Sequence, residues 1–83
     1  MRIHIDREAM QVFRMLREDA GAIRDKIQEL RQNPYPDDMI VIPRAEGEPD
    51  IYEVFASGYW IGYSVDTSDP GETVITIWGI EEN

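Results

Sequence analysis

The hydrophobic periodicity of the chain changes at one point, and this change constrains the fold more than any other feature. Up to residue 32, apolar residues recur every three or four positions, which is typical of amphipathic helices. The segment Asn33-Pro34-Tyr35-Pro36 cannot continue a helix, because proline lacks a backbone donor and disfavours the α conformation at the preceding residue. After it come runs with the β-branched and aromatic composition of strands. The pattern predicts one α+β domain over residues 1–83.

The N-terminal part is predicted to form a short strand and an antiparallel helical hairpin. Arg2 to Ile5 alternates polar and apolar residues, as a half-buried strand does. Asp6 is a suitable N-cap for a helix from about Arg7 to Glu18, and after a break at residues 19–21 a second helix ends near Gln32. The predicted apolar stripes contain Met10, Phe13 and Leu16, with Ala9 and Val12 at the margin, and then Ile23, Ile27 and Leu30.

The C-terminal part is predicted to form a three-stranded antiparallel meander packed on the helices. Its strands are Tyr52–Ala56, Tyr59–Val65 and Thr73–Trp78. Ser57-Gly58 is a two-residue turn, and residues 67–71 form a longer turn that is rich in helix and strand breakers. Residues 37–50 are expected to form a connector with one extended piece at Met39–Ile42, and the sequence leaves open whether it covers the sheet.

Two symmetric turns would divide the meander into an apolar face and an open face. The apolar face is expected to pack on the helices and carries Tyr52, Val54, Ala56, Tyr59, Ile61, Tyr63, Val65, Ile75 and Ile77. The open face carries Glu53, Phe55, Trp60, Gly62, Ser64, Val74, Thr76 and Trp78. This pairing sets Phe55 beside Trp60 and Trp60 beside Trp78, so that an aromatic row crosses the open face.

The aromatic row is the candidate binding surface, since contiguous exposed apolar surface tends to mark an interaction site. The candidate partner-binding residues are Glu53, Phe55, Trp60, Gly62, Thr76 and Trp78. Two alternatives remain: the connector covers the row, or the aromatic pairs only stiffen the sheet. Gly62 between large neighbours would let a ligand approach the backbone, although a bulge explains it equally well.

Charge is distributed unevenly along the chain, whose net charge is −9. Residues 1–31 contain 7 cations and 6 acids, whereas the remainder has Arg44 against 11 acids. Nucleic-acid binders neutralise phosphates with Lys and Arg, so an acidic surface disfavours direct nucleic-acid binding. A basic or amphipathic protein segment is the better electrostatic match, while the alternative is that the acidity only keeps the domain soluble.

Few groups in the sequence suggest chemistry. There is no cysteine, and His4 is the only histidine, so neither a metal site nor a cofactor is expected. The acidic pairs Asp37-Asp38 and Glu81-Glu82 have the pattern of solvated chain rather than of a general acid and base. No apolar run is long enough to span a membrane, and a cytoplasmic location is expected. Catalytic residues stay unassigned.

The order of these predicted elements resembles the RelE/ParE toxin superfamily across nearly the whole chain. Leu30-Arg31-Gln32-Asn33-Pro34 with Pro36 looks like the exit from the family's second helix. Tyr52-Glu53-Val54-Phe55, followed by Gly58 to Asp66, looks like its central hairpin. The resemblance implies the toxin half of a type II toxin–antitoxin pair, in which an antitoxin segment wraps the toxin. RelE-like members cut mRNA on the ribosome, and ParE-like members poison DNA gyrase.

The sequence departs from this family at the positions of its basic residues. RelE-type cleavage needs cations on the open sheet face, which stabilise the charge that develops at the phosphate. Glu53 stands where the family usually has arginine, Tyr59-Trp60 where it has Tyr-Arg, and Trp78 to Asn83 where it continues with Gly-His-Arg. The expected function is a toxin-type component with a degenerate or altered ribonuclease site, which if active would be a ribosome-dependent mRNA endonuclease. The alternative is a non-enzymatic acidic protein-interaction module that uses the open sheet face, and a homodimer is left open.

Overall fold

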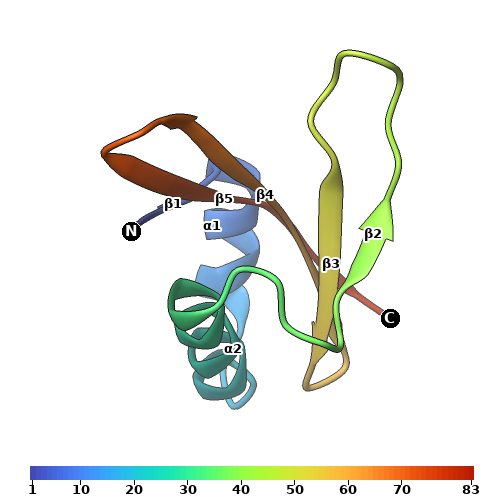
Figure 1. The fold of residues 1–83 in the computed structure, drawn as a ribbon. Coiled ribbons are helices and arrows are strands. Elements are labelled where there is room, and N and C mark those ends of the chain that lie inside the picture. The colour runs from blue at the N-terminus through green and yellow to red at the C-terminus, as the bar shows by residue number, and fades with distance from the viewer.

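A five-stranded mixed sheet forms the frame of the protein (Figure 1). The computed structural model describes residues 1–83. The strands are β1 (Arg2–Ile5), β2 (Ile40–Ile42), β3 (Ile51–Ala56), β4 (Tyr59–Asp69) and β5 (Glu72–Glu82), in the sheet order β1-β5-β4-β3-β2. β1 runs parallel to β5, and all other neighbours are antiparallel. The α+β class and the antiparallel run of β3, β4 and β5 are therefore confirmed, while β1 adds a parallel strand beside β5 and β2 adds an antiparallel strand beside β3.

Two helices, α1 (Arg7–Met15) and α2 (Ala20–Gln32), separate β1 from β2 in the sequence. Asp6 caps α1 as predicted, because its carboxylate accepts a hydrogen bond from the Glu8 backbone N–H at 3.4 Å. α1 ends before the predicted Glu18, since Leu16 adopts an extended backbone with φ −71° and ψ 142°. α2 ends where the prolines require it, with Asn33 extended. No helix of the chain combines the length and apolar character that a bilayer crossing requires.

Both helices contribute to a single hydrophobic core against one face of the sheet. The fully or nearly fully buried apolar residues are Ala9, Ile23, Ile27, Leu30, Val54, Ile61, Tyr63, Ile75, Ile77 and Ile80. The predicted apolar face of the meander is confirmed, since its remaining members pack against this cluster. The buried stripe of α1 is rotated relative to the prediction, because Ala9 is the fully buried residue while Met10 lies outside the cluster.

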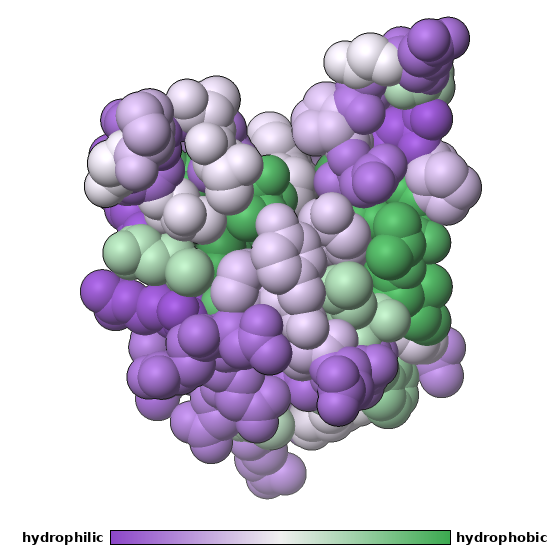
Figure 2. Space-filling view, in the orientation of Figure 1, coloured by the Kyte–Doolittle hydropathy of each residue, from purple (hydrophilic) through white to green (hydrophobic).

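The connector between α2 and β3 is only partly extended. It contributes β2, and residues 43–50 then project beyond the sheet as a loop (Figure 1), which forms the hydrophilic projection at the upper right of Figure 2. An ion pair of 2.9 Å between Arg44 and Glu48 braces this loop. The loop leaves the open face uncovered, since Phe55 and Trp78 remain 43% and 48% exposed.

A candidate binding groove on the open sheet face

The turn between β3 and β4 sets the register of the first half of the open face. Ser57 and Gly58 both have positive φ values, 52° and 85°, which match the twist of a tight two-residue hairpin. The Ser57 hydroxyl donates a hydrogen bond of 2.6 Å to the carboxylate of Asp19, which ties this turn to the segment between the helices. Phe55 consequently lies opposite Trp60, as predicted, with 5.0 Å between their ring centroids.

The turn between β4 and β5 is shorter than predicted. Asp69 pairs with Glu72, so Pro70-Gly71 alone closes the hairpin, and the predicted five-residue turn over residues 67–71 is wrong. The Asp69 carboxylate accepts a hydrogen bond of 3.0 Å from the Gly71 backbone N–H and thereby closes the turn. Both strands extend farther than the sequence indicated, so β4 and β5 pair along most of their length.

A bulge at Trp78 decides the register of the second half. Gly62 pairs with Gly79 and Tyr63 pairs with Ile77, which leaves Trp78 as the extra residue on β5. The predicted contact between Trp60 and Trp78 across the strands is therefore wrong, because Trp60 lies opposite Glu81. The bulge also brings the alternation after it back into phase with the core, where Ile80 is 3% exposed.

The pairing of two glycines creates a hollow in the open face. Gly62 lies opposite both Glu53 on β3 and Gly79 on β5, and a Cβ atom at either glycine would meet no atom within 4 Å. The hollow has a volume of about 220 Å³, and we call it the indole hollow. Its lining residues are Ile51, Glu53, Trp60, Gly62, Trp78, Gly79 and Glu81.

Hydrogen bonds within the chain fix both indoles of this hollow. The Trp60 Nε1–H donates to Asn83 Oδ1 at 3.2 Å, and the Trp78 Nε1–H donates to Ser64 Oγ at 2.8 Å. Since both donors are occupied, the indoles offer a partner their rings rather than their N–H groups. The Ser64–Trp78 bond also explains why Ser64, on the open face, is only 9% exposed.

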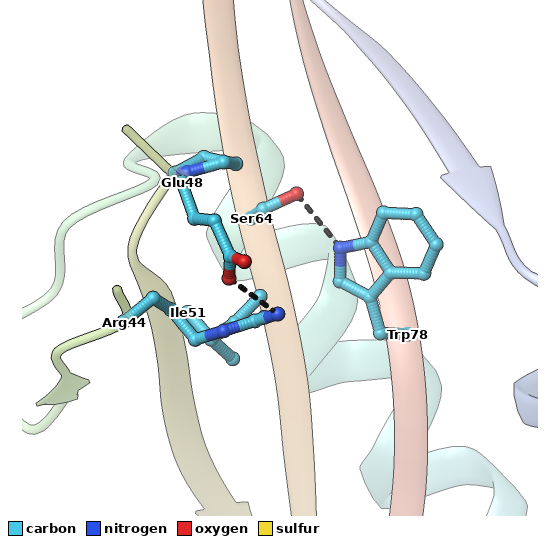
Figure 3. A pocket seen from close by; sticks show the side chains of 6 residues that line it. Arg44, Glu48, Ile51, Ser64 and Trp78 are labelled. Atoms are coloured by element: carbon cyan, nitrogen blue, oxygen red, sulfur yellow. Dashed lines mark hydrogen bonds and ion pairs between the residues drawn. The ribbon is translucent and has the colours of Figure 1, made fainter. Parts of the chain in front are cut away.

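A second hollow adjoins the first and has a volume of about 530 Å³ (Figure 3). It is lined by Arg44, Glu48, Pro49, Ile51, Ser64 and Trp78. Figure 3 shows the Arg44–Glu48 ion pair on one side of Ser64 and the indole of Trp78 on the other. Because Ile51 and Trp78 line both hollows, we treat the two as one open-face groove.

The two ends of the groove differ in charge. Glu53 and Glu81 line the indole hollow, and no cation does. Arg44 lines the second hollow, but its guanidinium is engaged by the Glu48 carboxylate at 2.9 Å. The groove therefore presents negative charge at its indole end and a neutralised pair at its loop end.

The structure brings together most, but not all, of the predicted site residues. Glu53, Trp60, Gly62 and Trp78 line the groove. Phe55 lies outside the lining and packs against the Trp60 ring. Thr76 pairs with Ser64 and with His4, and it lines neither hollow.

Sequence reasoning missed the residues that depend on the bulge and on the loop. These are Gly79 and Glu81 on β5, Ile51 at the start of β3, and Arg44, Glu48 and Pro49 in the loop. The one available signal is Gly79 directly after Trp78, since glycine inside a strand often marks a bulge.

Titratable groups outside the groove serve the fold. The Tyr63 hydroxyl donates a hydrogen bond of 2.7 Å to the Pro34 carbonyl, and burial raises the pKa of Tyr63 far above its ordinary range, so the phenol stays neutral. No group of three acidic or histidine side chains is placed to hold a metal ion. The groove itself offers aromatic rings, carboxylates and exposed backbone, which are groups suited to binding.

Comparisons of the chain with family models, with curated proteins and with solved structures find no match. The resemblance to RelE/ParE toxins therefore stays a prediction from the sequence. The functional interpretation rests on the geometry of the open-face groove.

Proposed function

We propose that this protein is an interaction module that binds a segment of a partner protein in the open-face groove. The proposal rests on one observation, a groove with two indoles held in place by hydrogen bonds. At the indole end, the floor of this groove is the backbone of Gly62 and Gly79. Large exposed aromatic groups in a defined concavity are typical of the residues that dominate binding energy at protein interfaces. Trp78 alone leaves 48% of its surface to solvent.

The charge of the groove indicates the kind of partner. The part of the chain that builds the groove has one arginine against 11 acids, and that arginine is ion-paired. Electrostatic complementarity favours a segment with basic and apolar side chains and speeds its association. The same field opposes the approach of RNA or DNA, whose binding depends on neutralised phosphates.

Site-specific photo-crosslinking in living cells tests the proposal. With p-benzoylphenylalanine at Phe55, which flanks Trp60, we expect a discrete protein adduct that Trp60→Ala removes. Met15 is the matched control position, because it is 79% exposed on α1, away from the groove. Adducts of equal yield from both positions, or adducts insensitive to Trp60→Ala, would contradict binding in the groove.

The second candidate function is a toxin-type component of a toxin–antitoxin pair, with the groove facing the target or the antitoxin. The observation in its favour is the element order, in which one strand and two helices precede the antiparallel strands β3, β4 and β5. Ribonuclease action by the RelE-type mechanism is disfavoured, since the indole hollow carries Glu53 and Glu81 and no cation.

Induced expression of the chain in a bacterial host distinguishes the two candidates. Growth arrest with cleavage of ribosome-bound mRNA would support a ribonuclease with other catalytic groups. Arrest without cleavage would favour a gyrase-type target. Normal growth with folded protein is the result that we expect for an interaction module.

A further inference from the structure

We propose that the indole hollow is a receptor for one basic side chain of the partner, with arginine preferred over lysine. The inference deepens the proposed function and rests on it. It assigns to one end of the groove a particular chemistry, namely a cation held over the glycine pair between two indoles and two carboxylates.

The pairing of β4 with β5 places the two indoles on either side of the glycine pair. Trp60 precedes Gly62 by two residues on β4, so both lie on the open face. Trp78 occupies the bulge on β5, directly before Gly79. A side chain that enters above the glycines therefore has one indole in each direction along the strands.

The two carboxylates come from the strands on either side of β4. Glu53 on β3 lies opposite Gly62 of β4, and Glu81 on β5 lies opposite Trp60 of β4. Both line the hollow, where no cation neutralises them, and neither belongs to an ion pair of the chain. A guanidinium or ammonium group placed there would gain both the attraction to the carboxylates and that to the indole rings.

Other occupants fit the hollow less well. An apolar side chain would cover the carboxylates of Glu53 and Glu81 without compensating their charge, and burying an unpaired charge is costly. An acidic side chain would be repelled. Arginine is preferred over lysine, because its planar guanidinium stacks on aromatic rings and donates several hydrogen bonds at once.

The glycine floor provides the depth that such a side chain needs. Neither Gly62 nor Gly79 has a positive φ, and a Cβ atom at either position would meet nothing within 4 Å. The absence of side chains there is therefore required neither by backbone conformation nor by packing. Its consequence is an open path to the backbone of β4 and β5.

The two tryptophans of the chain are both in this hollow, so their signals report directly on its occupancy. The probe is an acetylated, amidated pentapeptide with a central arginine between serine and valine residues, compared with peptides carrying lysine or citrulline instead. Citrulline has nearly the shape of arginine but no charge. Titrations follow the two indole N–H resonances by NMR together with the backbone amides of β3, β4 and β5.

We expect the arginine peptide to shift both indole resonances and the amides of Gly62 and Gly79. The lysine peptide should bind more weakly, and the citrulline peptide at least about fivefold more weakly than arginine, as loss of the cation–aromatic attraction requires. Added salt should weaken the arginine peptide and leave the citrulline peptide nearly unaffected.

Two variants test the lining of the hollow. Gly62→Val places a side chain on the floor, where its Cβ meets no atom within 4 Å, and should abolish the shifts, while Gly21→Ala on α2, where a Cβ is equally unhindered, should leave them unchanged. Replacing both Glu53 and Glu81 by glutamine should weaken arginine binding by about fivefold or more, on the scale of one or two partly exposed ion pairs. Glu18→Gln is the matched exposed charge control.

The outcomes separate failure of this inference from failure of the proposed function. Equal binding of the arginine and citrulline peptides, with shifts in the groove that persist in Gly62→Val, would overturn the proposal that the hollow receives a cation. The proposal of a binding module would still stand. If no peptide perturbs the groove and crosslinking from Phe55 also yields nothing specific, both proposals fail.

Discussion

Neighbouring residues of the same strands have opposite environments on the two faces of the central sheet. On the helix side, Ile61 lies opposite Ile80 and both are buried almost completely. On the open side, the flanking pairs are Trp60 with Glu81 and Gly62 with Gly79. On the helix side, buried side chains from both helices and from the sheet form one cluster. The open side keeps a hollow where a β-branched side chain would suit a strand better, and this difference supports the proposal that the open face binds a partner.

The largest expected difference between the faces is in the free energy of unfolding. Ile61→Ala leaves a cavity in the core and should cost about 2–5 kcal/mol. Trp60→Ala, one residue away, removes the pairing with Phe55 and the exposed hydrogen bond to Asn83, and should cost only about 0.5–1.5 kcal/mol. Urea unfolding monitored by circular dichroism measures both. Equal costs would mean that Trp60 supports the fold and that the open face is not reserved for a partner.

The hydroxyl of Tyr63 tests how firmly the helix side holds the chain that leaves α2. Tyr63→Phe removes the hydrogen bond to the Pro34 carbonyl and should lower the free energy of unfolding by about 0.5–1.5 kcal/mol. Tyr59→Phe is the control, since the Tyr59 hydroxyl makes no hydrogen bond in the chain while its ring packs on the core. An equal effect of the two changes in urea unfolding would contradict a specific role for the Tyr63 hydroxyl.

The ion pair of Lys26 with Asp38 gives the stability of the helix side a dependence on pH. The two groups are 2.6 Å apart, and this hydrogen bond lowers the pKa of Asp38 below its ordinary value near 3.8. Because the pKa is lower in the folded state, the pair stabilises the fold fully above that ordinary value. Its contribution is lost as the pH falls through the lowered pKa.

Asp38→Asn should therefore cost about 0.5–1 kcal/mol at neutral pH, a small effect because the Asp38 side chain is 53% exposed. Thermal unfolding should show this difference from the wild type shrinking as the solution is acidified from about pH 5 to about pH 2. Asp37→Asn, at an exposed position without an ion pair, is the control. A difference that stays constant with pH would show that Asp38 acts through something other than its charge.

The smallest expected effect is a gain. Gly62→Val should raise the free energy of unfolding by about 0.5–1 kcal/mol, because valine restricts the unfolded chain and suits a strand, while its Cβ meets no atom. Gly58→Val should instead destabilise, since Gly58 has a φ of 85°. A loss of stability in Gly62→Val, measured by urea unfolding, would mean that the fold itself requires glycine at this position. The hollow would then be a consequence of packing and not a feature that serves ligand binding.

The predictable parts of the molecule are those with local causes. The prolines after Asn33 end α2 where the sequence places the end, and the Ser57-Gly58 turn fixes the pairing of Phe55 with Trp60. The candidate site was predicted only in part. Glu53, Trp60, Gly62 and Trp78 line the groove, whereas Thr76 does not and Phe55 only supports Trp60.

The sequence by itself determined the α+β class, the first hairpin and the assignment of most strand residues to the buried face. Periodicity and turn residues act over a few positions, and this range suffices for these features. Tertiary structure alone decided the bulge at Trp78, the facing of Gly62 and Gly79, and the loop residues Arg44 and Glu48 beside the groove. The physical reason is that register beyond a bulge is set by which side chains the helices can bury. One extra residue keeps Ile77 and Ile80 in the same core and, in doing so, opens the hollow on the other side.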